Sequence, residues 1–533
     1  MFRAVTSRKP AGFTGDTAAW LAGRFDSRTG AGLDPCFGLL WDSGGVSVLV
    51  CGCEEEPVLR ELAEPARAAR ELVRARDSWR TLLGRVRVRT PEPALDRLIN
   101  GWAAYQALSC RVLGRASIYQ SGGAYGFRDQ LQDVANLLLI DSQRAKRHIL
   151  TCCARQFLEG DVLHWWHETP SGPRGVRTGC SDDLLWLPWA LCEYAEKTGD
   201  LALCRETAPW LDAPPLEPEE RDRYFSPPAA GPESPVIDHA RRAMDRVLSR
   251  GTGPHGLLLT GSGDWNDGMD RVGGESVWLT WFFAHTARRF AALAVRLGME
   301  GAGYERAADA CVRAAERSWD GSWYLRGWWQ DGAPLGGAGA PACAIDSVAQ
   351  SWAAFAGADE NRTRTALLAS FERLYDEAHG LTKLFDPPFG DTGRDPGYIR
   401  SCGPGFRENG GQYTHGALWL ASALLKKGLT REGMAVLLST VPEMHDPSVW
   451  GAEPYVLAAD VSANPDHYGE ALWSWYTGSA GWFFRVVLED LLGITLREGR
   501  LSVEPRLPDG WEGYEAEICG RHIRVSRGGT AIT

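Results

Sequence analysis

Apolar residues recur at helical spacing through most of the chain beyond residue 95. Leu95, Leu98, Ile99, Trp102 and Tyr105 lie about one helical turn apart, which places them along one face of a helix. The same spacing predicts helices over residues 129–140, 142–158, 182–198, 237–250, 275–297, 303–318, 343–357, 360–378, 413–427, 430–440 and 471–493. Strands do not alternate with these helices, which argues against a parallel α/β sheet. The sequence therefore predicts a mainly α fold.

The pattern changes towards both ends of the chain. Residues 1–55 contain short apolar segments punctuated by glycine, such as CFGLLW and GVSVLVCGC, which predict β-strands. Helical composition from Glu55 to Leu83 predicts a helical linker over 56–94. Beyond Leu492, alternating polar and apolar residues predict a small β unit over 493–533. The helices of 95–492 and their long loops suit an (α/α)6 barrel, a fold whose loops gather at one end.

The composition is typical of a globular protein and argues against several classes of partner. Hydrophobic residues make up 44% of the 533 positions and charged residues 23%. The formal net charge is −11 and basic residues form no long stripe, so we expect no nucleic-acid binding. No apolar run reaches about 18 residues and the N-terminus lacks an apolar signal segment, so we expect a cytoplasmic protein without a membrane span. We interpret the 13 scattered cysteines as reduced thiols.

Tryptophan is unusually frequent, with 23 residues against 14 tyrosines and 17 phenylalanines. A tryptophan side chain offers a broad apolar face and one N–H donor. Sugar rings present apolar C–H faces with polar rims, so this composition indicates carbohydrate binding. A large aromatic core would explain the same count, and composition leaves both interpretations open.

The loop GSGDWNDGMD, from Gly261 to Asp270, is the strongest candidate for chemistry. Cleavage of a glycosidic bond needs a proton delivered to the leaving oxygen, and a carboxyl group beside an aromatic ring can supply it. Trp265 and Asp267 bring such a pair together, with Asn266 between them. The alternative is a helix-capping aspartate beside a core tryptophan.

Three further loops carry residues that can bind anions or sugars. Arg128 and Asp129 follow a glycine-rich loop and open a helix, either as ligand contacts or as a structural ion pair. His415 lies near a helix start, where it is either an anion donor or structural. Thr477 and Gly478 precede another helix, whose backbone N–H groups bind anions or are capped by side chains.

The segment from Asp161 to Trp189 combines aromatic residues with His164, His167, Asp182 and Asp183. The two histidines lack a third ligand at metal spacing, so we expect no metal site. The two aspartates are candidates either for a helix N-terminus or for accepting hydrogen bonds from sugar hydroxyl groups.

Several segments, taken in order, resemble glycoside hydrolase family 94, the inverting β-glucoside phosphorylases. They are YQSGGAYGFRDQLQD, HWWH, SDDLLWLPWALCEYAEKTGD, GDWNDGMD, ENGGQYTH, AEPYV and SWYTGSAGW, which together cover about residues 100–490. The glycine loop resembles the subgroup of 1,2-β-oligoglucan phosphorylases and the phosphorylase-like end of cyclic β-1,2-glucan synthases. The resemblance implies an (α/α)6 barrel, with residues 1–55 as the remnant of an N-terminal β-sandwich.

The resemblance also assigns roles to residues of this chain. It implies that Asp267 is the general acid, and that Trp265 lines the donor sugar site. Phosphate is expected at Arg128, His415, Thr477 and Gly478, and substrate at Arg115, Asp129 and Trp265. Beyond the resemblance, Asp182, Asp183 and Glu408 are further candidates for substrate binding. The ligands are a β-glucan oligosaccharide and inorganic phosphate as co-substrate, with no cofactor and no metal.

Two other functions remain open at this stage. An inverting hydrolase would need Asp182, Asp183 or Glu408 as a base that activates water, and would release glucose without phosphate. A catalytically weak sugar-binding remnant is the third interpretation. The sequence leaves open the preferred linkage, the chain length of the substrate, and whether the chain forms a homodimer.

Overall fold

The structure is a computed structural model that describes residues 3–25, 35–41, 48–52, 55–217, 220–227, 230–391 and 393–533. The chain divides into two compact units, Met1–Leu82 and Leu83–Thr533.

The N-terminal unit contains two antiparallel strand pairs, which confirms the predicted strands. Strand β1 (Arg3–Thr6) pairs with β4 (Leu49–Gly52), and β2 (Gly12–Asp16) pairs with β3 (Pro35–Leu40). Helix α1 (Thr17–Leu21) follows β2 and is capped by Asp16. Val5 packs with Leu59 and Ala63 in a small core.

The predicted helix from Glu55 to Leu83 is interrupted. Helix α2 (Glu56–Ala63) ends just before Glu64, and α3 (Pro65–Leu83) begins at the proline that follows Glu64. Glu64 is extended, with φ −59° and ψ 124°, because a residue before proline avoids the helical region.

The helical linker predicted over 56–94 differs from the structure at Val86–Arg89, which form strand β5. Val86 and Val88 are buried and alternate with exposed arginines, the period-two pattern of a strand. Strand β5 pairs with β24 (Gly513–Ile518), which is followed in the same sheet by β25 (Arg521–Ser526) and β26 (Gly529–Ile532). The last three of the strands expected near the C-terminus are therefore joined by a strand from far upstream, while β22 (Ile494–Arg497) and β23 (Arg500–Val503) form a separate hairpin.

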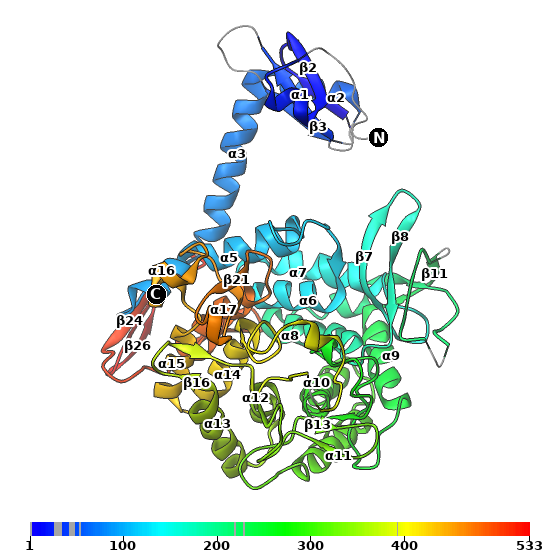
Figure 1. Ribbon diagram of the computed structural model, residues 1–533, viewed down its shortest axis with the longest axis vertical. Coiled ribbons are helices and arrows are strands. Elements are labelled where there is room, and N and C mark those ends of the chain that lie inside the picture. The colour runs from blue at the N-terminus through cyan, green and yellow to red at the C-terminus, as the bar shows by residue number, and fades with distance from the viewer. Residues whose placement is uncertain are drawn as a thin grey trace. The chain divides into compact units, whose positions relative to one another are not determined.

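The predicted helices are present, which confirms a mainly α fold (Figure 1). They are α4 (Pro93–Arg97), α5 (Ala103–Gln106), α6 (Phe127–Asn136), α7 (Leu138–Cys153), α8 (Trp186–Thr198), α9 (Val236–Ser249), α10 (Val277–Arg296), α11 (Ala302–Glu316), α12 (Ser347–Ala356), α13 (Glu360–Leu374), α14 (Thr414–Lys426), α15 (Thr430–Leu438) and α17 (Ser479–Arg485). The structure adds the short helix α16 (Pro447–Trp450), which the spacing does not predict. The span 471–493 begins instead as strand β21 (Ala471–Ser474). Across the described ranges, no helix combines the length and apolar character needed to cross a membrane.

The longer helices form two layers within the unit Leu83–Thr533. Helices α6, α8, α10, α12, α14 and α17 contact one another in that order, and α17 returns to α6, so the inner layer is a closed cycle. Helices α7, α9, α11, α13 and α15 pack against α6, α8, α10, α12 and α14 respectively. Each outer helix directly follows its inner partner in the sequence except α9, which is separated from α8 by the three strands β9 (Thr207–Leu211), β10 (Asp222–Phe225) and β11 (Ala230–Pro235).

Tryptophan side chains fill the interior of the inner layer. Trp186, Trp278, Trp352 and Trp419 are fully buried and come from α8, α10, α12 and α14. The ring centroids of Trp352 and Trp419 lie 5.2 Å apart, and those of Trp278 and Trp352 6.0 Å apart. The indole N–H groups of Trp278, Trp352 and Trp419 have no hydrogen-bond partner. Much of the tryptophan content is thus explained by an aromatic core.

We predict that Trp278→Ala lowers the free energy of unfolding by about 3–5 kcal/mol, because it leaves a cavity where α10, α12 and α14 meet. Trp278→Phe keeps most of the packing and removes an unpaired N–H group, so we expect a loss of about 1.5 kcal/mol or less. The control Trp102→Ala, at a side chain that is 39% exposed, is expected to cost about 1 kcal/mol or less. Chemical denaturation measures all three. Equal losses for Trp278→Ala and Trp102→Ala would contradict this account of the core.

Candidate active site

A cavity of about 440 Å³ brings together loops that are far apart in the sequence. Of the residues predicted to act in catalysis or binding, those that line it are Arg128, Asp129, Trp265, Asp267, Glu408, His415, Thr477 and Gly478. Arg115, Asp182 and Asp183 do not line it.

Local structure explains how these side chains converge. Two-residue strands lead directly into inner helices: β6 (Tyr125–Gly126) precedes α6, β12 (Glu275–Ser276) precedes α10, and β19 (Gln412–Tyr413) precedes α14. Arg128 and Asp129 lie in the first turn of α6, and His415 lies in the first turn of α14. The cavity is therefore built at the N-terminal ends of inner helices.

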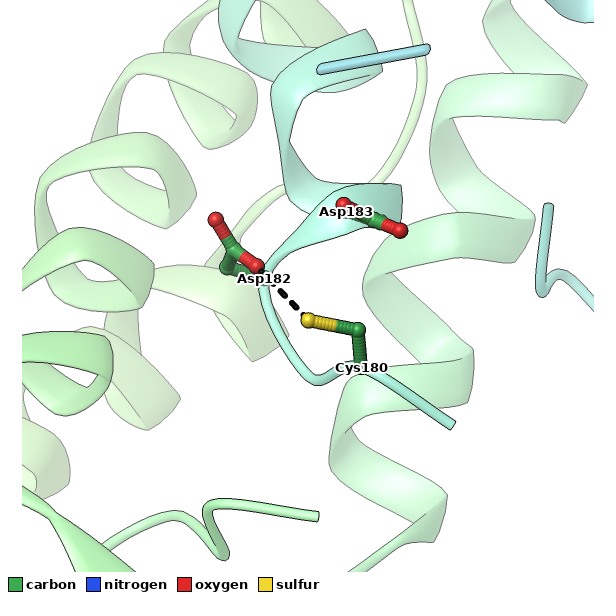
Figure 2. A group of neighbouring side chains, drawn as sticks. All are labelled: Cys180, Asp182 and Asp183. Carbon is green, nitrogen blue, oxygen red and sulfur yellow. Dashed lines mark hydrogen bonds between the residues drawn. The ribbon is translucent and has the colours of Figure 1, made fainter. Parts of the chain in front are cut away.

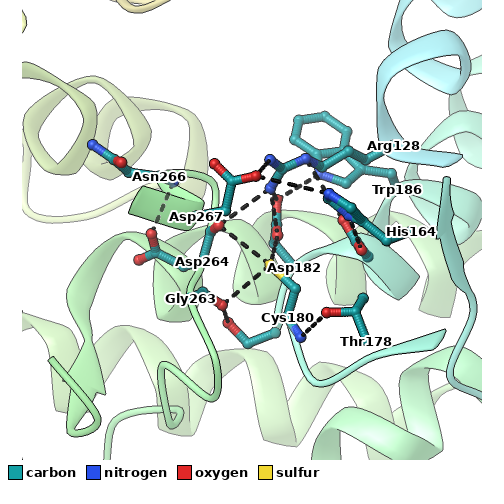
Figure 3. Close-up of polar contacts among 12 residues, drawn as sticks. Arg128, His164, Thr178, Cys180, Asp182, Trp186, Gly263, Asp264, Asn266 and Asp267 are labelled. Carbon is teal, nitrogen blue, oxygen red and sulfur yellow. Dashed lines mark hydrogen bonds and ion pairs between the residues drawn. The ribbon is translucent and has the colours of Figure 1, made fainter. Parts of the chain in front are cut away.

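Asp267 is the carboxyl group of its loop that faces the cavity. Its side chain is 39% exposed, and its Oδ2 atom lies 3.2 Å from Arg128 Nη2 and 3.7 Å from His164 Nε2 (Figure 3). Burial and the charge of Asp267 raise the pKa of the Tyr398 phenol, which hydrogen-bonds to Asp267. The position of Asp267 fits delivery of a proton into the cavity.

The other acids of the same loop anchor it instead. Asp264 is fully buried and accepts hydrogen bonds from Ser276 Oγ at 2.7 Å and Arg326 Nη2 at 2.6 Å. Asp270 pairs with Arg221 and accepts a hydrogen bond from the backbone N–H of Tyr398. These anchors fix the loop on which Asp267 stands.

Arg128 is the buried cation around which the site is organised. Its Nη1 atom donates to Asp182 Oδ1 at 3.0 Å and to the carbonyl oxygen of Asp264 at 3.2 Å, and its Nε atom lies 3.6 Å from Asp183 Oδ1. Burial opposes its charge, but Asp182, Asp267 and Asp183 together raise the pKa of the guanidinium well above its ordinary value. Arg128 thus remains charged.

The predicted contact of Asp182 and Asp183 with substrate does not fit this arrangement, because both carboxyl groups are buried behind other side chains. Asp182 accepts a hydrogen bond from Trp186 Nε1 at 2.9 Å as well as from Arg128. Asp183 contacts His164 Nδ1 at 2.6 Å. Neither side chain caps the short helix that begins at Asp183. Their observed partners are Arg128, His164 and Trp186.

Cys180, Asp182 and Asp183 form a buried group with atoms close enough to share a metal ion (Figure 2). Their hydrogen bonds do not fit that role. Burial, Asp183 and Asp182 raise the pKa of the Cys180 thiol well above its ordinary value, so the thiol stays protonated. It donates to Asp182 Oδ1 at 3.4 Å, while Arg128 already neutralises the carboxylates. His167, the other histidine considered for a metal, contacts the carbonyl oxygen of Gly122 at 2.8 Å.

His415 presents a neutral ring to the cavity. Burial, assisted by Arg111, lowers the pKa of His415 to about 3, and its Nε2 atom has no hydrogen-bond partner. Gly478 lies close beside it, since a Cβ atom at that position would be 3.3 Å from His415 Nδ1. Thr477 Oγ1 contacts Ser479 Oγ at 2.7 Å. This wall offers an unpaired ring nitrogen and a hydroxyl group to a ligand.

Arg111, rather than the predicted Arg115, lines the cavity. Arg111 Nε donates to Asp133 at 3.0 Å, Nη2 lies 3.4 Å from Asp129, and the guanidinium covers the Tyr476 ring at 4.5 Å. Burial opposes ionisation of Asp129, but Arg111 and Arg128 outweigh it and lower the pKa of that carboxyl.

The guanidinium of Arg115 is bound elsewhere. It donates to the carbonyl oxygens of Val112, Leu113 and Gly123 and covers the ring of Tyr125 at 4.0 Å. Sequence reasoning missed Arg111, His164, Tyr398 and Tyr476 as cavity residues. Arg111 lies in the helical segment Ala107–Leu113, whereas Arg115 lies beyond its end with φ 50°.

Glu408 lines the cavity beside an aromatic and cationic group. Its Oε2 atom lies 3.3 Å from Arg407 Nε, and the Arg407 guanidinium covers the Trp473 ring at 4.6 Å. Trp473 stacks on Tyr119 with ring centroids 5.7 Å apart. Arg407 and Trp473 both have positive φ, at 48° and 55°. Such backbone strain in bulky residues is concentrated at functional sites.

Residues 78–493 match the sequence profile of the "Glycosyl hydrolase 94 superfamily, catalytic domain". The chain is 42% identical over 488 residues to the cyclic beta-(1,2)-glucan synthase NdvB of Rhizobium meliloti (strain 1021), which covers 88% of this chain and 17% of that protein. It is 28% identical to the solabiose phosphorylase of Paenibacillus borealis, over 89% of this chain and 58% of that protein. The chain therefore spans a small to moderate part of these relatives.

Among solved structures, a family GH78 rhamnosidase of Bacillus sp. GL1 superposes with a TM-score of 0.56 at 13% identity. The superposition covers 84% of this chain and 41% of that one. At this identity the likeness concerns the fold alone.

We predict that Arg128→Met destabilises the protein by about 3–5 kcal/mol at neutral pH, because Asp182 and Asp183 lose the buried charge that compensates them. Burial already raises the pKa of Asp182 against the opposing charge of Arg128, and the substitution removes that opposition. A carboxyl whose folded pKa lies above its unfolded value binds protons more tightly in the folded state. The free energy of unfolding that Arg128→Met loses relative to the wild type should therefore become smaller as pH falls from 7 towards 5.

The matched control is Arg271→Met, which removes an exposed pair with Asp395 and is expected to cost less than about 1 kcal/mol at any of these pH values. Thermal and chemical unfolding across pH measure both variants. An Arg128→Met deficit that is small, or that grows on acidification, would contradict the buried network described here.

Proposed function

The chain belongs to the glycosyl hydrolase 94 superfamily, and on that premise we propose that it cleaves β-glucosidic bonds with inorganic phosphate and inverts the configuration at C1. The product is α-glucose 1-phosphate, and the reaction is reversible. The observation that carries the proposal is the make-up of the cavity wall. The half-exposed carboxyl group of Asp267 shares the cavity with the cations Arg111 and Arg128, with the unpaired ring nitrogen of His415, and with the carboxyl groups of Asp129 and Glu408.

We propose that the two helical layers form an (α/α)6 barrel. The closed cycle of α6, α8, α10, α12, α14 and α17 supports this, with α7, α9, α11, α13 and α15 outside. In such a barrel the N-terminal ends of the inner helices gather the catalytic loops at one mouth. The first-turn positions of Arg128 and His415 are consistent with that placement.

The mechanism follows from the charges of the reactants. Asp267, in its protonated form, donates its proton to the glycosidic oxygen while the C1–O bond breaks. Phosphate attacks C1 from the opposite face of the sugar, which inverts the anomeric configuration. An inverting hydrolase needs a second carboxylate to deprotonate water, whereas phosphate is already an anion and needs cations and N–H donors.

Phosphate is proposed to bind between Arg128, His415, Thr477 and Gly478. The neutral His415 ring can donate through Nε2, which has no partner among the described residues. Nη2 of Arg128 reaches Asp267, while Nη1 is taken by Asp182 and Asp264. Trp265, which is 8% exposed and packs on Trp419, is proposed to line the donor sugar.

The proposed substrates are β-1,2-linked gluco-oligosaccharides. The 42% identity to a protein named cyclic beta-(1,2)-glucan synthase supports this linkage, and the relative named solabiose phosphorylase supports phosphorolysis. Glu408 and Asp129 are proposed to bind sugar hydroxyl groups, since both line the cavity.

A hydrolase is less well supported. Asp182 and Asp183, which such an enzyme could use as its base, are sealed behind Arg128 and His164. Glu408 remains as the base candidate that lines the cavity, and it lies beside Arg407. A sugar-binding remnant would not require Asp267, Arg128 and His415 to line one cavity.

We predict that Asp267→Asn lowers phosphorolysis of an unactivated β-linked disaccharide by about 10²–10⁴-fold, because the leaving sugar is no longer protonated. With a dinitrophenyl β-glucoside the loss should be much smaller, since that leaving group needs no acid. The control Asp309→Asn, on the exposed side of α11, should behave as the wild type. An equal loss on both substrates would argue against Asp267 as the acid.

We predict that His415→Gln raises the KM for phosphate by roughly 10–100-fold, the effect of losing one hydrogen bond to a charged ligand. At saturating phosphate, kcat should fall much less. Initial rates at varied phosphate concentrations measure the split. An unchanged KM for phosphate would remove His415 from the proposed phosphate site.

We expect inorganic phosphate to be released when the chain is given α-glucose 1-phosphate with a β-1,2-linked glucose disaccharide. Release with a β-1,4- or β-1,3-linked acceptor instead would overturn the linkage and keep the reaction. If the folded chain releases no phosphate with any acceptor, the sugar-binding remnant becomes the better account.

A further inference from the structure

Asp267 gives up one proton in every turnover of the proposed phosphorolysis. The attacking HPO4²⁻ carries one proton, and it releases that proton when the ester becomes a sugar phosphate dianion. The proton of phosphate must therefore reach Asp267 before the next turnover, and a titratable side chain on the cavity wall next to Asp267 would provide a path.

His164 occupies such a position. It lies on strand β7 (Leu163–Thr169) and lines the cavity. Its Nε2 atom faces Asp267 Oδ2 at 3.7 Å, and its Nδ1 atom contacts Asp183 Oδ2 at 2.6 Å. Figure 3 shows His164 beside Arg128 and Asp267, with each side chain coming from a different segment.

The buried carboxylate behind the ring determines its protonation. The Asp183 side chain is 1% exposed, so it is an acceptor that water does not compete for. A carboxylate in this place holds the proton on Nδ1 and leaves Nε2 as the atom that gains and loses a proton. The Asp183 and His164 pair thus resembles other carboxylate–histidine pairs in which the carboxylate orients the ring.

The charged groups that face the His164 ring are Asp183, Asp267, Asp129 and Arg128. Burial and Arg128 disfavour the imidazolium, but Asp183 and Asp267 outweigh them and raise the pKa of His164 to about 9. At neutral pH the ring therefore carries a proton on Nε2, directed towards the catalytic carboxyl.

Histidines with a purely structural role in this chain look different. His239 contacts Gln156 through Nδ1 and the carbonyl oxygen of Ala208 through Nε2, so both nitrogens have protein partners. Burial lowers the pKa of His239 to about 4. His164 instead has one protein partner at hydrogen-bond distance and turns its second nitrogen to the cavity and the acid.

We propose that His164, oriented by Asp183, relays protons between the bound phosphate and Asp267. This inference rests on the phosphorolysis proposed above. Nε2–H of the imidazolium gives its proton to Asp267 as the ring and carboxylate close the gap between them. Asp267 passes the proton to the glycosidic oxygen, and the C1–O bond breaks as phosphate attacks. The neutral ring then takes the proton that the phosphate ester releases, which restores the imidazolium and balances the cycle.

The first test is the pH profile of phosphorolysis in the full chain. Activity should fall as pH rises through the pKa of His164, near 9, because the ring loses the proton that it relays. This fall is the alkaline limb of the pH profile. In Asp183→Asn that limb should move to lower pH, since the charge that favours the imidazolium is gone. In His164→Gln the limb should vanish and kcat should fall by about 10²-fold or more. His167→Gln, on the same strand, should keep the wild-type limb.

A structural role for His164 would lower activity in the variants without moving the limb. An unmoved limb in Asp183→Asn, or a wild-type limb in His164→Gln, would therefore overturn the proposal. If His164→Gln fails to fold, the isosteric Asp183→Asn variant decides the same question.

A second measurement does not depend on activity. The ring nitrogens of His164 can be titrated by NMR in the chain labelled with 15N-histidine, with the His164→Gln spectrum identifying the signal. We expect a pKa near 9 that falls in both Asp183→Asn and Asp267→Asn. A pKa at or below the ordinary value of histidine, or one that neither variant changes, would overturn the relay. An inactive wild-type chain would instead count against the proposed phosphorolysis.

Discussion

The site depends on one buried cation. The guanidinium of Arg128, from the start of α6, holds Asp182 and Asp183 from the segment before α8, and Asp264 and Asp267 from the loop before α10. Removing charges from water is expensive, so a buried carboxylate is tolerated when a cation and hydrogen bonds compensate it. The same guanidinium contacts Asp267 on the cavity wall, the carboxyl group that we propose as the catalytic acid.

The same cavity holds two histidines in opposite electrostatic states. Burial and Arg111 lower the pKa of His415 to about 3, so its ring is neutral. Asp183 and Asp267 overcome burial and raise the pKa of His164 to about 9, so its ring is charged. A neutral ring with an unpaired nitrogen suits a ligand that brings its own negative charge. A charged ring beside a carboxylate suits the transfer of a proton.

The sequence predicted the helices well because their periodicity is local. Leu95, Leu98 and Ile99 are buried as their spacing predicts, and the Asp267 loop faces a cavity. Strand β5 was beyond such reasoning, because its partner β24 lies more than 400 positions away and pairing at that distance leaves no local signal. The burial of Asp182 and Asp183 was not predictable for a related reason: motif resemblance locates a residue in the sequence, but does not show whether its carboxyl faces a ligand or a buried arginine. Arg111 lines the cavity in place of Arg115 because the helical segment Ala107–Leu113 ends before Arg115, an end that the sequence pattern does not mark.

The central claim is that phosphate, rather than water, attacks C1 while Asp267 protonates the leaving sugar. The most direct measurement is combined 31P and 1H NMR of the chain incubated with a β-1,2-linked glucose disaccharide, with and without inorganic phosphate. The account predicts α-glucose 1-phosphate as the first-formed product, and no cleavage when phosphate is left out. Free glucose formed at the same rate in the absence of phosphate would contradict it.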